Sequence, residues 1–163
     1  MGNLLFSPNG RINPSQFMKG VVIVLIASFV LGLPTALGMS GAIPLIASLI
    51  SVVLLWCWIV LWIKRYHDAG KSGWMSLIPI LVFVIAMIVF VLTYGGAELS
   101  AIFQLASEGA SAEEQEAVSK AFEAKLDSFP ALIILTIMSA VIAFLFNAII
   151  KRDDHENQFG PAS

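Results

Sequence analysis

The segment of residues 64–74 carries the densest group of side chains that could do chemistry. It contains Arg65, His67, Asp68 and Lys71 between two long apolar blocks. An imidazole beside a carboxyl group could act as general base and acid, and a guanidinium or ammonium group could hold a phosphate or a carboxylate. Two hypotheses follow: a surface enzyme that uses His67 and Asp68, and a binding site for an anionic group.

More specific motifs are incomplete in this segment. Residues 70–72, Gly-Lys-Ser, resemble the end of a phosphate-binding loop, but that loop needs a glycine at the position of Arg65. Neighbours such as His67 and Asp68 do not face one ion, and a metal site needs three or four ligands. The one cysteine, Cys57, lies in an apolar block, which excludes a disulfide framework and a cysteine-based zinc site. We therefore expect no metal and no cofactor.

Four apolar blocks must position these side chains. Hydrophobic residues make up 58% of the chain and charged residues 12%, and the apolar residues are gathered in blocks. A bilayer core about 30 Å thick needs about 20 such residues in a helix, and only a helix satisfies its own backbone in hydrocarbon. The sequence predicts one all-α integral membrane domain over 1–163. It is a four-transmembrane-helix bundle with spans at about 14–37, 42–63, 75–95 and 130–150.

The basic residues indicate how the bundle lies in the membrane. Segments 1–19, 64–74 and 151–163 hold seven of the nine lysines and arginines. The positive-inside rule therefore places both termini in the cytoplasm of a bacterial inner membrane. An alternative is a cleaved signal peptide with its apolar region at 21–33, but the basic region before it is long and the apolar block reaches spanning length.

The connection 96–129 predicts two amphipathic helices on the extra-cytoplasmic side. Ser111 and Glu114 form a capping box, and Val118, Phe122 and Leu126 follow at helical spacing. The segment is acidic, whereas helices that lie on a membrane surface are usually basic on their polar side. We expect these helices to form a cap that packs on the outer ends of the protein or on a partner.

Three short motifs resemble a known family. They are Gly10-Arg11-Ile12-Asn13, the run Arg65–Trp74, and Asn157-Gln158-Phe159-Gly160-Pro161. Together they are similar to the YhaH-like small inner-membrane proteins, the domain of unknown function numbered 805, over essentially the whole chain. The resemblance implies an inner-membrane location and brings no established activity or catalytic residues. The long acidic 95–129 connection departs from the family pattern.

The predicted topology puts all three motifs on the cytoplasmic side. We expect them to meet as a polar cluster under the bundle, with Asp153 or Asp154 as further carboxylates. The cluster would either tie the helix ends together or bind an anionic lipid headgroup. Its predicted members are Arg11, Arg65, His67, Asp68, Lys71 and Asn157.

Small and polar residues recur four apart in two spans. They let helices approach closely and exchange hydrogen bonds, within the bundle or in a homo-oligomer. For Asn147 we expect a hydrogen bond to a neighbouring helix. The two stripes are Ser28, Gly32 and Ala36, and Ser139, Ala143 and Asn147.

These features favour a non-catalytic membrane component that binds lipid headgroups or a protein partner. A small oligomeric transporter or channel is one alternative, although the spans carry no ionisable group in their apolar interiors. A membrane-surface enzyme that uses His67 and Asp68 is the other. Nucleic acid is not an expected partner, because seven cations face four acids on the cytoplasmic side, a small surplus that topology explains.

Overall fold

The computed structural model describes residues 2–162, and within them it contains helices and no strand. Four of the helical segments are long and apolar enough to cross a membrane, which confirms the predicted fold class of a multi-pass helical membrane protein. In chain order the elements are α1 (Gly2–Leu5), α2 (Pro14–Ala36), α3 (Ala42–Asp68), the 3₁₀ helix η1 (Gly73–Ser76), α4 (Leu77–Tyr94), α5 (Gly96–Glu108), α6 (Ala112–Leu126) and α7 (Phe129–Ile149).

Local sequence signals set the ends of these helices. Asn13 caps α2 in a complete capping box with Gln16, and Pro14 occupies the first helical position, where its missing N–H costs nothing. Gly70 adopts a left-handed φ of 68° just after α3, a conformation that only glycine adopts readily. The helix α3 continues past the end of the predicted span at residue 63 to Asp68, and Gly73 begins η1.

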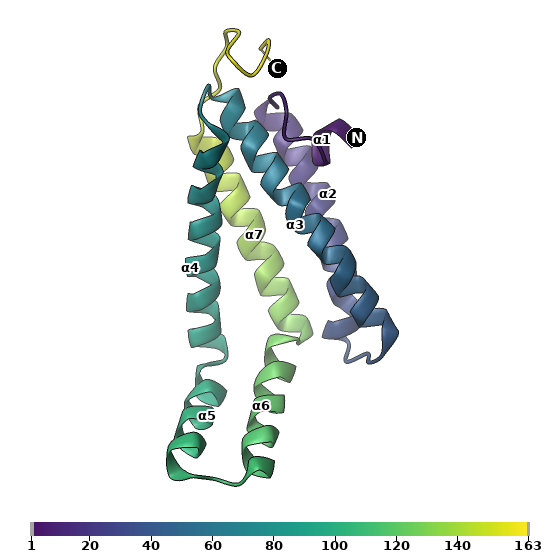
Figure 1. Ribbon diagram of the computed structural model, residues 1–163, viewed down its shortest axis with the longest axis vertical. Helices are drawn as coiled ribbons and strands as arrows, with labels where there is room; N and C mark the ends of the chain where they lie inside the picture. The colour runs from purple at the N-terminus through teal and green to yellow at the C-terminus, as the bar shows by residue number, and fades with distance from the viewer. Residues whose placement is uncertain (1, 163) are drawn as a thin grey trace.

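The helices form an antiparallel bundle with both chain ends at one end of it (Figure 1). The helix α2 packs mainly against α3 and α7, while α4 packs against α7 and η1. In the figure α3 and α4 lie close near the chain termini and diverge toward the opposite end. We call the end that carries both termini the terminal end.

Small residues allow the close packing of α2 in the bundle. A side chain on Gly20 would meet Leu61 of α3 at 2.4 Å, and one on Gly32 would meet Leu132 of α7 at 2.6 Å. Ala143 of α7 is fully buried in the core with Phe17. Ser28 and Ala36 are half-buried on the same helix as Gly32. In the described residues, Gly32 and Ala143 thus serve the packing of this bundle itself.

The helices α5 and α6 form a hairpin that continues α4 and α7 beyond the bundle (Figure 1). The Lys125 ammonium donates to both carboxylate oxygens of Glu98 at 2.8 Å, which lowers the pKa of that carboxyl group and ties the two helices. At the base of the hairpin, Tyr94 and Ser128 share a hydrogen bond of 3.2 Å between their hydroxyl oxygens. The predicted amphipathic helices exist, but the hairpin leaves the α2–α3 connection uncovered.

Candidate functional site

A buried carboxylate at the terminal end lies between two guanidinium groups. Nε of Arg11 and Nη1 of Arg65 each lie 3.1 Å from a different oxygen of Asp68. The side chains of Arg11, Arg65 and Asp68 are 3%, 1% and 0% exposed. Arg65 and Asp68 meet because they are three residues apart on one face of the last turns of α3. Arg11 reaches the same carboxylate from the segment before α2, where the Ile12 amide donates to the Lys64 carbonyl at 3.3 Å.

The Arg65 guanidinium also fixes the end of α7. Its Nε donates to Oδ1 of Asn147 at 2.7 Å, and its Nη2 donates to the carbonyls of Asn147, at 3.2 Å, and Ile150. The amide of Asn147 in turn donates to the Pro14 carbonyl at 3.3 Å. One side chain of α3 therefore satisfies main-chain carbonyls at the C-terminus of α7, where a helix leaves acceptors without partners and carries negative dipole charge.

The Arg11 guanidinium holds the C-terminal tail. It donates to the carbonyls of Asp153 and His155, the second at 2.8 Å, and to that of Asp68 at 3.2 Å. The Asp153 amide returns a hydrogen bond of 2.8 Å to the Asp68 carbonyl. Asp68 and His155 lie 57 and 144 positions from Arg11 along the chain, and both are thereby brought to its side chain.

His67 contacts other groups than those around the Asp68 carboxylate. Its Nδ1 lies 3.0 Å from the Gly10 carbonyl, so Nδ1 carries the proton and a neutral ring presents Nε2 as an acceptor. The ring stacks on Phe159 with centroids 3.7 Å apart and planes 5° apart. Asn157 fixes the same tail by donating to the His67 carbonyl at 3.2 Å and to the Asp153 carboxylate at 3.3 Å. The amide of His155 and then the Asn157 side chain lower the pKa of the Asp153 carboxyl group.

We call this assembly the terminal cluster: Arg11, Arg65, His67, Asp68, Asn147, Asp153 and Asn157. Two guanidiniums face one carboxylate at its centre, and main-chain carbonyls and the Asn147 side chain accept the remaining arginine hydrogen bonds. Within residues 2–162, no buried side-chain nitrogen or oxygen lacks a hydrogen-bond partner. Since a buried charge is tolerated only when paired and hydrogen-bonded, the cluster is chemically complete as it stands.

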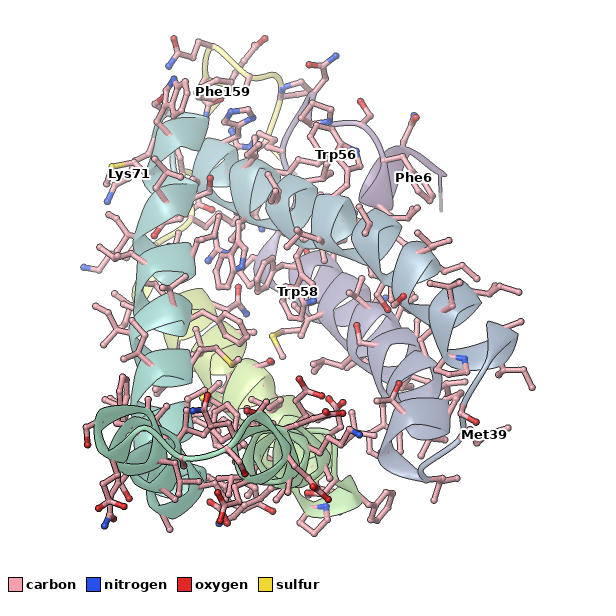
Figure 2. All side chains as sticks on the ribbon, turned by 60° about the horizontal axis from the view of Figure 1, so that its bottom comes forward. Phe6, Met39, Trp56, Trp58, Lys71 and Phe159 are labelled. Atoms are coloured by element: carbon pink, nitrogen blue, oxygen red, sulfur yellow. The ribbon has the colours of Figure 1, made fainter. Side chains whose placement is uncertain are left out.

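The structure brings five of the six predicted cluster residues together and leaves Lys71 outside. Lys71 follows the left-handed Gly70, is exposed, and points away from the bundle (Figure 2). Asp153 joins the cluster, whereas Asp154 pairs with Arg152 at 3.2 Å on the surface. Asn147 makes the expected bond to neighbouring helices, and through it belongs to the cluster.

Sequence reasoning missed two parts of this arrangement. The first is the set of main-chain carbonyls around the arginines, which have no residue signature. The second is Lys64, which is buried and donates to the Asn3 carbonyl of α1. No group of three or more histidine, cysteine or acidic side chains in the described part of the chain could hold a metal ion.

Comparisons with known proteins agree with the three motifs. No curated protein and no solved structure matches the chain. One family model, described as "Protein of unknown function (DUF805)", matches residues 5–161 and so includes all three motifs. The chain therefore belongs to the DUF805 family, whose function is unknown.

Proposed function

We propose that the protein is a non-catalytic component of a bacterial inner membrane whose terminal end faces the cytoplasm and binds anionic lipid headgroups. The observation that carries this proposal is that the cations at the terminal end fall into a buried group and an exposed group. The arginines of the terminal cluster are buried and fully bonded within the protein. Other cations at the same end have exposed side chains that can meet headgroups: Lys19, Lys71 and Lys151.

The distribution of charge supports the orientation. The terminal end carries seven of the nine basic residues, and the segment 96–129 at the opposite end carries seven of the eleven acidic ones. Loops rich in lysine and arginine stay in the cytoplasm, and exposed cations there face the anionic inner leaflet. Trp74, 79% exposed beside Lys71, suits a position at the level of the headgroups.

The geometry favours binding over catalysis. Both oxygens of the Asp68 carboxylate accept hydrogen bonds from guanidiniums within the protein. His67 makes no hydrogen bond with it that the structure records and is bonded to the Gly10 carbonyl. The two residues therefore do not act on one substrate atom as a base and acid would. Ion flux in liposomes would instead support the transporter alternative.

Lipid selectivity tests the proposal directly. We expect Lys71→Gln to lower the preference for phosphatidylglycerol over phosphatidylcholine by up to about fivefold, since a cation near an anionic surface contributes about 1 kcal/mol. Native mass spectrometry of protein from mixed nanodiscs measures the ratio of retained lipids. Lys120→Gln, an exposed lysine of α6 at the opposite end, is the matched control. An unchanged ratio in Lys71→Gln and in the triple variant with Lys19→Gln and Lys151→Gln contradicts the proposal.

The orientation has its own test. The native Cys57 is buried, so a membrane-impermeant maleimide reports only on introduced cysteines. We expect Ser72→Cys to resist labelling in spheroplasts and to label after permeabilisation, whereas Ser107→Cys on the exposed face of α5 should label from outside. The reverse pattern would place the terminal end outside the cytoplasm.

A further inference from the structure

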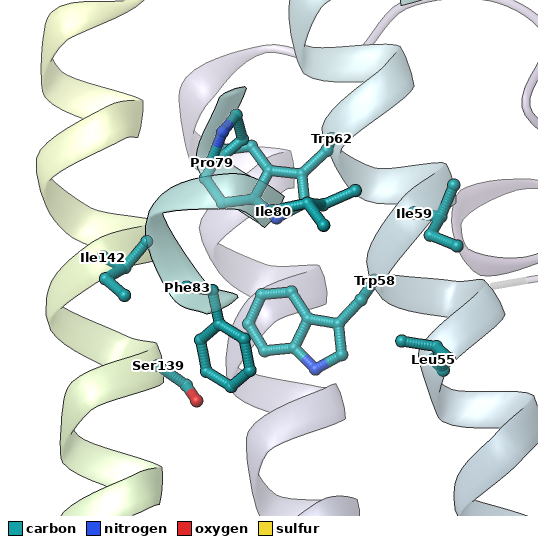
Figure 3. A pocket seen from close by; sticks show the side chains of 9 residues that line it. All are labelled: Leu55, Trp58, Ile59, Trp62, Pro79, Ile80, Phe83, Ser139 and Ile142. Atoms are coloured by element: carbon teal, nitrogen blue, oxygen red, sulfur yellow. The ribbon is translucent and has the colours of Figure 1, made fainter. Parts of the chain in front are cut away.

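A cavity opens between α3, α4 and α7 where α4 diverges from α3. It has a volume of about 320 Å³, and its walls include Leu55, Trp58, Trp62, Ile80 and Phe83 (Figure 3). Its one hydroxyl, that of Ser139, already donates to the Leu135 carbonyl at 2.8 Å. Apart from the indole N–H groups of Trp58 and Trp62, this lower cavity therefore offers only apolar surface, which suits a hydrocarbon chain.

A second cavity adjoins the first toward the terminal end. It has a volume of about 390 Å³ and shares Ile59 and Ile80 with the lower one. Its lining includes His67, Ser72 and Ser76. The two cavities together form one groove along α3 and α4, which is mostly apolar over its whole length and has its polar lining residues His67, Ser72 and Ser76 at the terminal end.

A few polar groups line the upper cavity. Ser76 is one of them and is only 4% exposed. Nε2 of His67 lies on the same wall, 3.2 Å from the position that a side-chain carbon on Gly73 would take. Lys71 is exposed and directly precedes the lining residue Ser72 in the chain. A hydroxyl, an acceptor nitrogen and an ammonium group are thus offered to a polar, negatively charged group.

The shape of the groove restricts its occupant. A transmembrane helix is about 10–12 Å across with its side chains, which is too wide for a slot of about 320 Å³ enclosed by two tryptophans and a phenylalanine. A flexible hydrocarbon chain fits such a slot. The occupant that satisfies both cavities is an amphiphile with one anionic, hydroxyl-bearing head and a long apolar tail.

We propose that this groove holds one membrane phospholipid, with its headgroup among Ser72, Ser76, His67 and Lys71 and one acyl chain between Trp58 and Phe83. The lipid lies with its head at the terminal end, so the proposal rests on the proposed cytoplasmic orientation of that end and deepens it. Unlike the surrounding lipids, this one is enclosed by three helices and remains with the protein during purification.

Photocrosslinking tests the proposal in vesicles of equal parts phosphatidylcholine and phosphatidylglycerol. The probe is phosphatidylglycerol with a diazirine in the middle of one acyl chain. We expect labels concentrated on the lower-cavity residues Leu55, Trp58 and Phe83, and competition by unlabelled phosphatidylglycerol. Ile80→Trp fills the junction of the two cavities and should abolish this labelling. Leu81→Trp, the neighbouring lipid-facing position of α4, should leave it unchanged.

A second variant keeps the test informative if Ile80→Trp does not fold. Ser139→Phe narrows the lower cavity from the α7 side and should also remove the enclosed label, while thermal unfolding in detergent reports whether each variant is folded. Labelling spread evenly over lipid-facing positions such as Leu81 and Val84, and unchanged in folded Ile80→Trp and Ser139→Phe proteins, overturns the groove. Equal groove labelling by phosphatidylcholine and phosphatidylglycerol probes, still lost in Ile80→Trp, would retain the groove and overturn the proposed headgroup preference.

Discussion

Replacing Asp68 by asparagine is expected to destabilise the protein more than any other single change in the terminal cluster. The substitution keeps the size of the side chain and removes its charge. It leaves the guanidiniums of Arg11 and Arg65 buried beside a neutral amide, whose NH₂ group faces arginine donors. Removing one partner of a buried ion pair costs about 3–5 kcal/mol, because the remaining charge has lost its compensation.

The measurement is the apparent unfolding midpoint in detergent. About 3–5 kcal/mol corresponds to a decrease of about 10 °C for a chain of this length. Asp154→Asn is the matched control, because Asp154 forms an exposed pair with Arg152 whose expected contribution is about 0–1 kcal/mol. If Asp68→Asn unfolds at the same temperature as Asp154→Asn, the terminal cluster does not hold the bundle together.

The bundle was predictable because hydrocarbon imposes simple requirements on a chain. Length and the lack of charge located all four membrane helices. One detail differs: the predicted span ends at residue 63, whereas the helix α3 continues to Asp68. Polar residues mark where a chain leaves the apolar layer, but a helix may continue past that level when its polar side chains find partners. Arg65 and Asp68 find theirs in each other, so the helix continues to them.

The sequence predicted most of the residues that form the site. It did not predict whether they bind a ligand or hold the helices together. The topology alone put Arg11, Arg65 and Asp68 at one end, and the charges implied that they would pair. Sequence could not show that Asn147 and the carbonyls of Ile150 and Asp153 take up the other arginine donors. Those contacts favour the hypothesis that the cluster ties the helix ends together. In the proposed function, the exposed lysines and not these arginines meet the lipid.

Lys71 lies outside the cluster because of the backbone turn that precedes it. Its position within the motif suggested a role with Arg65 and Asp68. The left-handed turn at Gly70 reverses the chain directly before it, and its side chain points outward (Figure 2). A residue-type pattern does not report such a reversal, because glycine permits several turn geometries.

The second large effect is expected for Arg65→Lys, which retains the positive charge. The guanidinium donates in several directions at once: to Asp68, to the side chain of Asn147, and to the carbonyls of Asn147 and Ile150. An ammonium group is a compact donor on a flexible chain and does not reproduce this planar, fork-shaped set of hydrogen-bond donors. A lysine that keeps the Asp68 contact leaves acceptors of α7 buried and unpaired, at about 1–3 kcal/mol each. We expect a loss of about 2–4 kcal/mol in the free energy of unfolding.

The location of the damage distinguishes this effect from a general loss of stability. Amide hydrogen exchange should accelerate at the C-terminus of α7 and in residues 150–155, while the α5–α6 hairpin remains protected. Arg152→Lys makes the same chemical change at a half-exposed position of the same tail and should alter neither stability nor exchange. If Arg65→Lys behaved like Arg152→Lys, charge alone would hold α7 in place. The directional fork between α3 and α7 would then contribute nothing, and the terminal cluster would tolerate any cation at that position.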